Sequence, residues 1–389
     1  MAAFLKLDLR SLLLVLIAFI GNAQILGFDI VLAVCVVALF TQFSQGTKFT
    51  RIAPWWLAAS LVVLLIANLR ADEIGIPYFE DYGLWPIKAL ILTLLIATGR
   101  DLTWPMGNMI ALAFICIALV GVGRVEEGRL VSVFGPNMLY RVFGFLMIFG
   151  VMLYPLRRGK ERLLMAGFAV FGLFASLLTG SSGAVLTIGV VVALAALRYS
   201  KKLSFGLGLL CLYLVAVLGP LAGSGGLGTT GPASLTRLTY KLTTLEASDR
   251  VVGWLEMMSE PFSALGYDHL DFWYLWSFGY QYPHNLFVEL YSFYGVIGAA
   301  LCIAVIIALY RAVPKVRQGD ILAMTLIVLA IGSMLSGDLS DNFGVIGLAC
   351  GQLSRTAIKR PQAAAQRSRQ ADPRASVSRQ IPQPRRYSH

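Results

Sequence analysis

Charged residues are scarce in this chain of 389 residues. Asp, Glu, Lys and Arg together make up 14% of the sequence, whereas soluble domains carry about 25%. Hydrophobic residues reach 57% and gather in long runs. Many of these runs approach the roughly 20 residues that a transmembrane helix needs. Because backbone groups inside lipid must bond within their own segment, the runs predict helices and exclude a soluble domain.

Cysteine and histidine are also rare, with five and three residues respectively. The cysteines lie inside apolar runs and none forms a CxxC pair, which argues against structural disulfides and zinc sites. Asp268, His269 and Asp271 lie close together in the sequence, but two acids beside one histidine are a weak metal-ligand set. We therefore expect neither a metal site nor a cofactor.

The hydrophobic pattern predicts an all-α integral membrane protein with about 12 transmembrane helices. The polytopic membrane domain is expected to cover residues 1–358, with one long loop at 222–284. Residues 359–389 are polar, basic and rich in Gln, Arg, Pro and Ala, a composition that predicts a disordered tail. The expected spans are 11–26, 28–44, 54–69, 84–99, 105–121, 138–156, 163–179, 183–198, 204–221, 285–310, 321–336 and 343–357.

The distribution of lysine and arginine predicts the orientation in the membrane. An N-terminus in the cytoplasm leaves most basic residues on the cytoplasmic side, including the clusters "RRGKER" and "RYSKK". Both termini are then cytoplasmic and the long loop lies on the outer, periplasmic side. This bias and the tail account for the net charge of +11, so the charge does not indicate binding to nucleic acid.

A minority of basic residues opposes this bias, because they fall on the outer side or within a span. Two explanations remain open for them: they bind an anionic ligand, or they pair with nearby acids such as Glu126, Glu127 and Asp249. The residues are Arg70, Lys88, Arg124, Arg129, Arg141, Arg237, Lys241 and Arg250.

Four stretches carry a family resemblance. "HNLFVELYSFYGVIG" has the form HNx9GxxG, and "FGPNMLYRVFGFLMI", "LLTGSSGAVLTIGVVVALAAL" and "DRVVGWLEMMSEPFSALGYD" precede it. In this order they resemble the landmarks of the O-antigen ligase and O-antigen polymerase superfamily of bacterial envelope proteins. The resemblance covers roughly residues 130–310. HNx9GxxG alone is a weak motif, and its specificity comes from the other three stretches.

The resemblance implies a metal-independent glycosyltransferase in the bacterial inner membrane. Its donor is an undecaprenyl-diphosphate-linked oligosaccharide, used on the periplasmic face to polymerise repeat units of a surface polysaccharide or exopolysaccharide. One alternative is the ligase that transfers O-antigen to the lipid A core. Another, from a different class, is a lipid-linked oligosaccharide transporter or flippase. Expected partners are membrane lipid and the flippase and chain-length regulator of the same pathway.

His284 is the expected general base of this reaction. Histidine titrates near neutrality, and the sequence places His284 at the start of a hydrophobic helix, with Pro283 positioned to begin it. The positive end of the helix dipole favours neutral imidazole and attracts anions. The next residue, Asn285, either caps the helix or binds sugar. Gly295 and Gly298 are expected to let helices approach closely.

Arg250 is the expected ligand of the donor's diphosphate. The sequence contains no DxD motif with which to hold a metal, and arginine can bind phosphate through two parallel hydrogen bonds. The chain departs from the family pattern at Ser182, where an arginine is common, and at Asp268, where a glycine is expected. Further substrate-binding candidates are Arg237, Lys241, Arg141 and Arg124.

Overall fold

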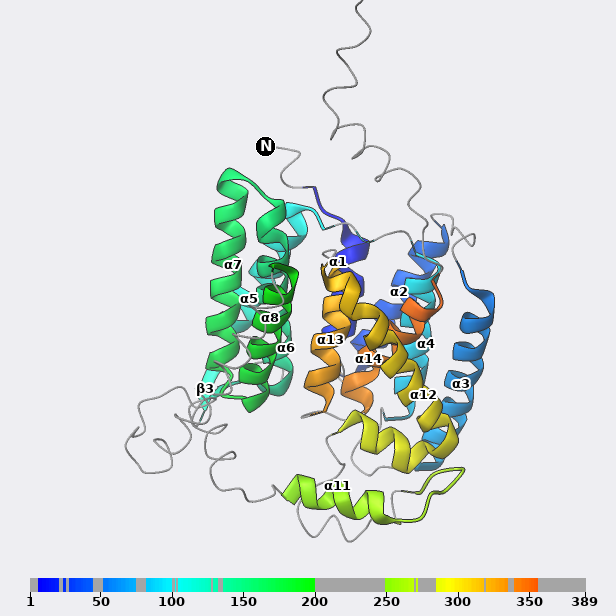
Figure 1. Ribbon diagram of the computed structural model, residues 1–389. Helices are drawn as coiled ribbons and strands as arrows, with labels where there is room; N and C mark the ends of the chain where they lie inside the picture. The colour runs from blue at the N-terminus through cyan, green and yellow to red at the C-terminus, as the bar shows by residue number, and fades with distance from the viewer. Residues whose placement is uncertain are drawn as a thin grey trace, which may run out of the picture. The chain divides into compact units, whose positions relative to one another are not determined.

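The computed structural model of the chain is almost entirely helical in its described part (Figure 1). It describes residues 6–20, 24–25, 28–44, 52–74, 82–99, 102, 104–126, 129–131, 136–199, 249–268, 271, 285–317, 320–334 and 339–355. The described residues up to Arg355 belong to one compact unit. The predicted tail at 359–389 lies outside the described residues.

Apart from α11, every described α-helix falls on one of the predicted spans, and the span predicted at 204–221 lies outside the described residues. The helices are α1 (Leu9–Ile20), α2 (Ile30–Ser44), α3 (Pro54–Ile74), α4 (Trp85–Ala97), α5 (Met106–Gly121), α6 (Pro136–Leu153), α7 (Gly159–Leu178), α8 (Ser182–Tyr199), α11 (Asp249–Ser259), α12 (Leu286–Arg317), α13 (Ile321–Ser333) and α14 (Leu339–Leu353). Short 3-10 turns, η3 (Tyr82–Leu84) and η4 (Tyr154–Leu156), precede α4 and follow α6.

Within the described residues, four helices are long and apolar enough to cross a membrane. Their apolar segments are Pro54–Ala71, Leu139–Leu156, Gly159–Leu178 and Leu286–Val316. Six further helices are apolar but shorter than this length, among them α1, α2 and α13. The structure is therefore that of an all-α protein with candidate membrane spans, and the count of twelve crossings stays a prediction.

Two short β-hairpins interrupt the helices, and the hydrophobic pattern did not predict them. One pairs β1 (Gln24–Ile25) with β2 (Phe28–Asp29), and the other pairs β3 (Arg124–Glu126) with β4 (Arg129–Val131). The first hairpin shortens the span expected at 11–26, since α1 ends at Ile20. It also brings Asp29 to the start of α2, where its carboxylate accepts a hydrogen bond from the Leu32 amide.

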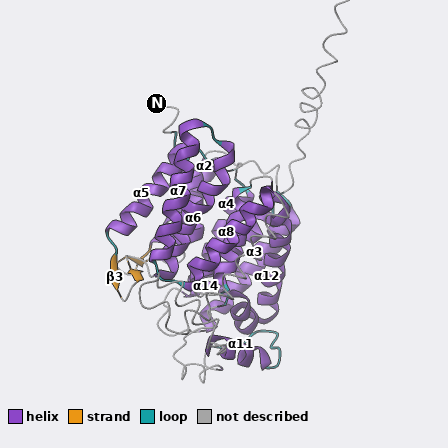
Figure 2. Cartoon of the chain, turned by 60° about the vertical axis from the view of Figure 1, so that its left-hand side comes forward, coloured by secondary structure: helices purple, strands orange, loops and turns teal. Residues whose placement is uncertain are grey.

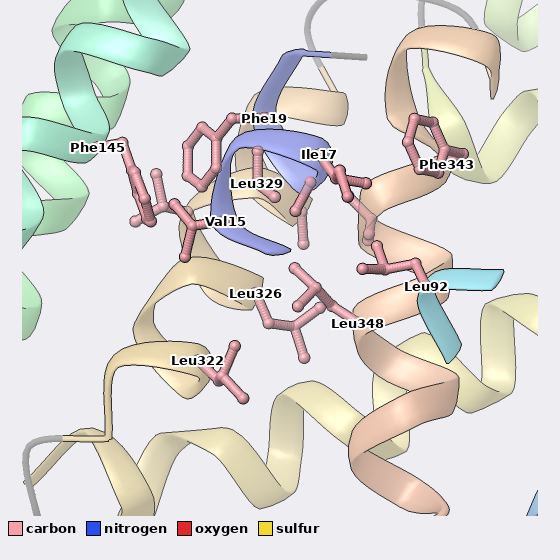
Figure 3. Close-up of a cluster of buried hydrophobic side chains, with 14 of the residues drawn as sticks. Val15, Ile17, Phe19, Leu92, Phe145, Leu322, Leu326, Leu329, Phe343 and Leu348 are labelled. Carbon is pink, nitrogen blue, oxygen red and sulfur yellow. The ribbon is translucent and has the colours of Figure 1, made fainter. Parts of the chain in front are cut away.

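Helix α1 runs through the hydrophobic core. Its side chains Ile17 and Phe19 face Phe343 of α14, Leu329 of α13 and Phe145 of α6 (Figure 3). The rings of Phe19 and Phe145 lie 3.9 Å apart between centroids. Helices α5 to α8 pack on one another beside this core, while α4 packs on α14, and α12 packs on both α13 and α14 (Figures 1 and 2).

Glycine allows α6 and α7 to touch backbone to backbone. A Cβ added to Gly172 of α7 would lie 2.7 Å from both the Met147 amide nitrogen and the Phe143 carbonyl oxygen of α6. Gly150 of α6 meets Ala169 of α7 in the same way. Small residues at such crossings are typical of helix pairs in membranes, where packing replaces the hydrophobic effect as the driving force.

We expect Gly172→Ala to lower the thermal stability of the detergent-solubilised protein. The added methyl group must push α6 and α7 apart, and overpacking of this kind costs about 1–3 kcal/mol. The matched control is Gly167→Ala on the same helix, where the new Cβ meets nothing within 4 Å and alanine is the better helix former. Thermal denaturation of both variants checks the prediction, and equal midpoints would contradict it.

Candidate functional site

Asn285 caps helix α12. Its side-chain oxygen accepts hydrogen bonds from the amides of Phe287 at 3.0 Å and Val288 at 3.3 Å. The side chain is only 5% exposed, and its Nδ2 donates to the Met334 carbonyl at 3.4 Å. The predicted helix start is therefore confirmed, and of the two roles predicted for Asn285 these bonds support the cap, because an asparagine oxygen can satisfy two of the open amides. Pro283 lies outside the described residues. Sugar binding by Asn285 stays a prediction.

Three buried polar side chains bind the backbone on either side of the connection between α13 and α14. We name these residues, Arg141, Asn285 and Glu289, the turn cluster. Asn285 binds the end of α13 through Met334. Glu289 accepts a hydrogen bond from the Leu339 amide, the first residue of α14, at 3.1 Å. Arg141 of α6 donates from Nη1 to the Asp341 carbonyl at 3.2 Å. The cluster thus joins α6 and α12 to the start of α14.

Glu289 is a candidate that the sequence reasoning missed. Its side chain is fully buried, and its carboxylate lies against the positive end of α14, which favours a negative charge. The signal was present in the sequence, because Glu289 is the only charged residue between His284 and Arg311. An ionisable residue inside an apolar span is a functional candidate by default.

Helix α12 breaks at Gly295, within the HNx9GxxG stretch. Gly295 has φ 51° and ψ −124°, a backbone conformation that is unfavourable for a residue with a Cβ. In an unbroken helix the Val296 amide would donate to the Ser292 carbonyl. Here Val296 donates to Ala264, in the loop segment that follows α11, at 3.0 Å, and the Tyr267 amide donates to Ser292 at 2.8 Å. The loop therefore supplies both missing partners.

The loop can approach this closely because of two glycines. Gly266 has φ +86°, and a Cβ there would lie 2.2 Å from the Phe293 carbonyl oxygen. A Cβ on Gly295 would lie 2.4 Å from the Ala264 carbonyl oxygen. The predicted close approach at Gly295 is thus one of loop to helix, not of helix to helix. At Gly298 it lies within α12, since a Cβ there would strike the Leu290 carbonyl.

The hydroxyl of Tyr267 secures the same loop from within, because it donates to the Pro261 carbonyl. The pKa of Tyr267 is raised above its ordinary value of 10.0, mainly by partial burial and to a smaller extent by the negative charges of Glu260 and Asp271. The hydroxyl therefore remains a donor through the neutral pH range, and this loop contact does not depend on pH there.

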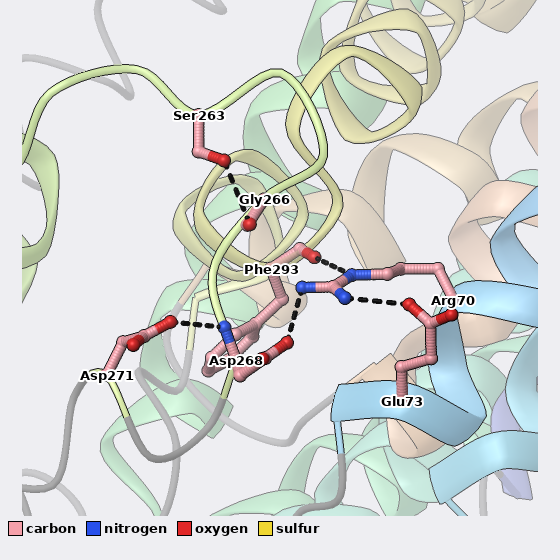
Figure 4. Close-up of polar contacts among 7 residues, drawn as sticks. All are labelled: Arg70, Glu73, Ser263, Gly266, Asp268, Asp271 and Phe293. Atoms are coloured by element: carbon pink, nitrogen blue, oxygen red, sulfur yellow. Dashed lines mark hydrogen bonds and ion pairs between the residues drawn. The ribbon is translucent and has the colours of Figure 1, made fainter.

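Arg70 connects the broken helix, the outer loop and α3 (Figure 4). Its Nη2 lies 2.6 Å from Asp268 Oδ1, its Nη1 lies 2.8 Å from Glu73 Oε2, and its Nε donates to the Phe293 carbonyl at 3.4 Å. The guanidinium thus sits at the carbonyl end of the first half of α12, where the helix dipole favours a cation. Arg70, which was predicted to lie on the outer side, is thus paired with Asp268, which departs from the pattern of the resembling family.

Lys88 also has an acidic partner. Its Nζ lies 2.5 Å from Asp29 Oδ2, and the two side chains are 0% and 4% exposed. This buried ion pair ties the start of α4 to the start of α2. Removing one partner of such a pair leaves an uncompensated charge and is strongly destabilising. For Arg70 and Lys88 the structure therefore favours pairing with acids over ligand binding, although the acids differ from those named as candidates.

Arg124 and Arg129 lie on the hairpin between α5 and α6. Arg124 is exposed on β3 opposite Val131, and Arg129 on β4 pairs in register with Glu126. Arg141 lies on α6 and is buried in the turn cluster, where its described contact is to backbone. Arg124 and Arg141 therefore lie on separate elements, strand β3 and helix α6.

The remaining family-like stretches mark helix ends. Pro136 is the first residue of α6, as its fixed φ favours. Gly180 turns the chain from α7 into α8 with φ 64°, and α8 begins at Ser182. Asp249 begins α11, so the backbone of Arg250 lies in its first turn. Later in α11, Met257 is buried and Trp254 packs against the core.

His284, Arg237 and Lys241 lie outside the described residues, and the side chain of Arg250 is likewise not described. Their proposed roles stay predictions. Among the described residues, no three His, Cys, Asp or Glu side chains lie close enough together to hold a metal ion.

Comparison with known proteins gave no match, either to a protein-family model or to a curated protein sequence.

We expect Arg70→Ala to loosen the outer loop from α12. Hydrogen–deuterium exchange followed by mass spectrometry should show faster exchange of the amides of Tyr267 and Val296, whose hydrogen bonds hold the loop to the helix. Glu73→Ala is the matched control, since it removes the more exposed carboxylate and leaves the Asp268 contact. Unchanged exchange in Arg70→Ala would show that the backbone bonds hold the loop without Arg70.

Proposed function

We propose that the protein is a membrane glycosyltransferase that polymerises lipid-linked repeat units of a surface polysaccharide or exopolysaccharide. In this proposal twelve helices cross the bacterial inner membrane, both termini are cytoplasmic, and α11 and the turn cluster lie at the periplasmic end. The donor is an undecaprenyl-diphosphate-linked glycan and the reaction needs no metal.

The observation that carries this proposal is the first half of α12, Leu286–Tyr294. It is set apart by the Asn285 cap at one end and the Gly295 break at the other. The break is bonded to the segment that directly follows α11. The helix that begins directly after the HN residues is therefore bonded to the segment that follows α11, and the resemblance assigns both stretches to one reaction.

The proposed reaction is a substitution at the anomeric carbon of the donor sugar. A hydroxyl oxygen of the acceptor forms the new glycosidic bond, and the bond from the anomeric carbon to the diphosphate oxygen breaks. His284 takes the proton of the attacking hydroxyl. The carrier diphosphate leaves with the bonding electron pair, and Arg250 stabilises its growing negative charge. Arg237 and Lys241 are further candidates for diphosphate contacts.

Two observations favour polymerisation over ligation to lipid A core. A polymerase must hold two lipid-linked diphosphates on one side of the membrane, and the chain has two groups of basic residues. One group lies at the hairpin before α6 with Arg124 and Arg129, and the other lies in the long loop with Arg237, Lys241 and Arg250. In addition, Ala299 follows GxxG, where ligases of the resembling family often have threonine.

We expect Arg250→Lys to lose nearly as much polymer as Arg250→Ala. Lysine keeps the positive charge but lacks the planar fork that binds a diphosphate through two parallel bonds. Polymer yield in cells, normalised to the amount of protein, measures the effect. Arg158→Lys, at the exposed residue before α7, is the matched control and should remain active. Restored activity in Arg250→Lys would show that the reaction needs only a positive charge at this position, and not a planar guanidinium.

A deletion strain tests the reaction itself. We expect it to accumulate single repeat units on the undecaprenyl carrier, detected by mass spectrometry of extracted lipids. The wild-type gene should restore polymer. His284→Ala, made at normal protein levels, should not, because the loss of a general base costs about 10²–10⁴ in rate.

Other outcomes of this experiment identify the error. Long chains on the carrier with none on lipid A would identify a ligase. Unchanged lipid-linked intermediates would remove glycosyl transfer as the function. Near-normal polymer from His284→Ala would contradict only the role of His284 as the general base.

A further inference from the structure

Helix α11 is too short to cross a membrane. Its 11 residues extend about 16 Å, against a hydrocarbon core of about 30 Å. The helix runs across the ends of the neighbouring helices instead of along them (Figures 1 and 2). It nevertheless exposes large apolar side chains, which neither a span nor a loop in water explains.

The exposed side chains are Leu255 at 63%, Met258 at 56%, Phe262 at 53% and Leu265 at 78%. We name these four residues the α11 apolar surface. Leu255 and Met258 are three residues apart and lie on one side of the helix. Each such side chain that stays in water lacks the roughly 1.5–3 kcal/mol of stabilisation that its burial would bring. We therefore expect another molecule to cover this surface.

Residues on another side of α11 pack within the protein. Met257 is buried, and Trp254 packs against the core of the protein. Glu256 lies on the remaining side of α11, where one of its carboxylate oxygens is buried, and the exposed Glu260 directly follows the helix. Glu256 is thus separated around the helix from Leu255 and Met258, as acidic and apolar residues are in helices that lie in the plane of a membrane interface.

The α11 apolar surface continues into the outward-facing sides of two candidate spans. Ala264, next to Leu265, is bonded to Val296 of α12, and Val296 is itself 54% exposed. Asp268 is bonded to Arg70 of α3, next to Leu69 at 70% exposure. Only 22% of the residues in the apolar segment of α3 are buried within the protein, so a membrane-embedded α3 must face lipid.

We infer that the α11 apolar surface is seated in the membrane interface, with the acyl chains of phospholipid as its occupant. The continuous apolar surface on α3 and α12 places the bilayer at the edge of the outer loop. The acids Glu256 and Glu260 disfavour anionic head groups, so zwitterionic phospholipid fits best. This inference does not depend on the proposed glycosyl transfer.

The test uses the full-length protein in nanodiscs of phosphatidylcholine. The five native cysteines are changed to alanine, and single cysteines at Leu255, Met258 or Leu265 are labelled with an environment-sensitive fluorophore. A doxyl group near the glycerol end of the acyl chain quenches from lipid, and iodide quenches from water. Glu260→Cys is the matched control, because Glu260 is an exposed charged residue between the apolar positions of the same segment.

Quenching by the lipid doxyl should be at least about threefold stronger at the three apolar positions than at Glu260, with the opposite order for iodide. Equal quenching by iodide at all positions would overturn the inference, because the surface would then face water. Shielding from both quenchers would also overturn it, in favour of a protein partner or a second copy. Doxyl quenching that appears only when anionic lipid replaces phosphatidylcholine would overturn the choice of occupant.

Discussion

The break of α12 imposes the constraint on which the outer end of the structure depends. A helix in an apolar environment cannot leave backbone groups unbonded, because no water replaces the missing partner. At Gly295 the normal bond from Val296 to Ser292 is absent, and the loop residues Ala264 and Tyr267 provide the replacement. The break therefore requires the loop, and Gly266 is required for the loop to reach it.

The basic residues on the disfavoured side can be divided by their contacts. Arg70, Lys88 and Arg141 each hold helix ends together through a carboxylate or a backbone carbonyl. These contacts compensate for the cost of placing a cation in or beside an apolar segment. The basic residues of the long loop (Arg237, Lys241 and Arg250) and of the hairpin (Arg124 and Arg129) stay candidates for an anionic ligand.

The sequence predicted the helix positions because long apolar runs have few other solutions, and the family-like stretches marked real helix ends. It did not predict the contacts between them. Arg70 and Asp268 were each recognised as anomalies, yet nothing in one sequence shows that two residues so far apart are partners. The same holds for the bonds between Ala264 and Val296. Glu289 is different, since its isolation in an apolar run was a visible signal.

The first half of α12 is held from several directions, which bears on what it can do. Glu289 and Asn285 fix it to α14 and α13, the Tyr294 hydroxyl accepts a hydrogen bond from Trp85 of α4 at 2.7 Å, and Arg70 binds its carbonyl end. Catalytic groups must be held near their productive geometry by a supporting layer of this kind. In the proposed reaction the substrates must therefore come to this half-helix, because a half-helix bonded to four neighbours has little freedom to move.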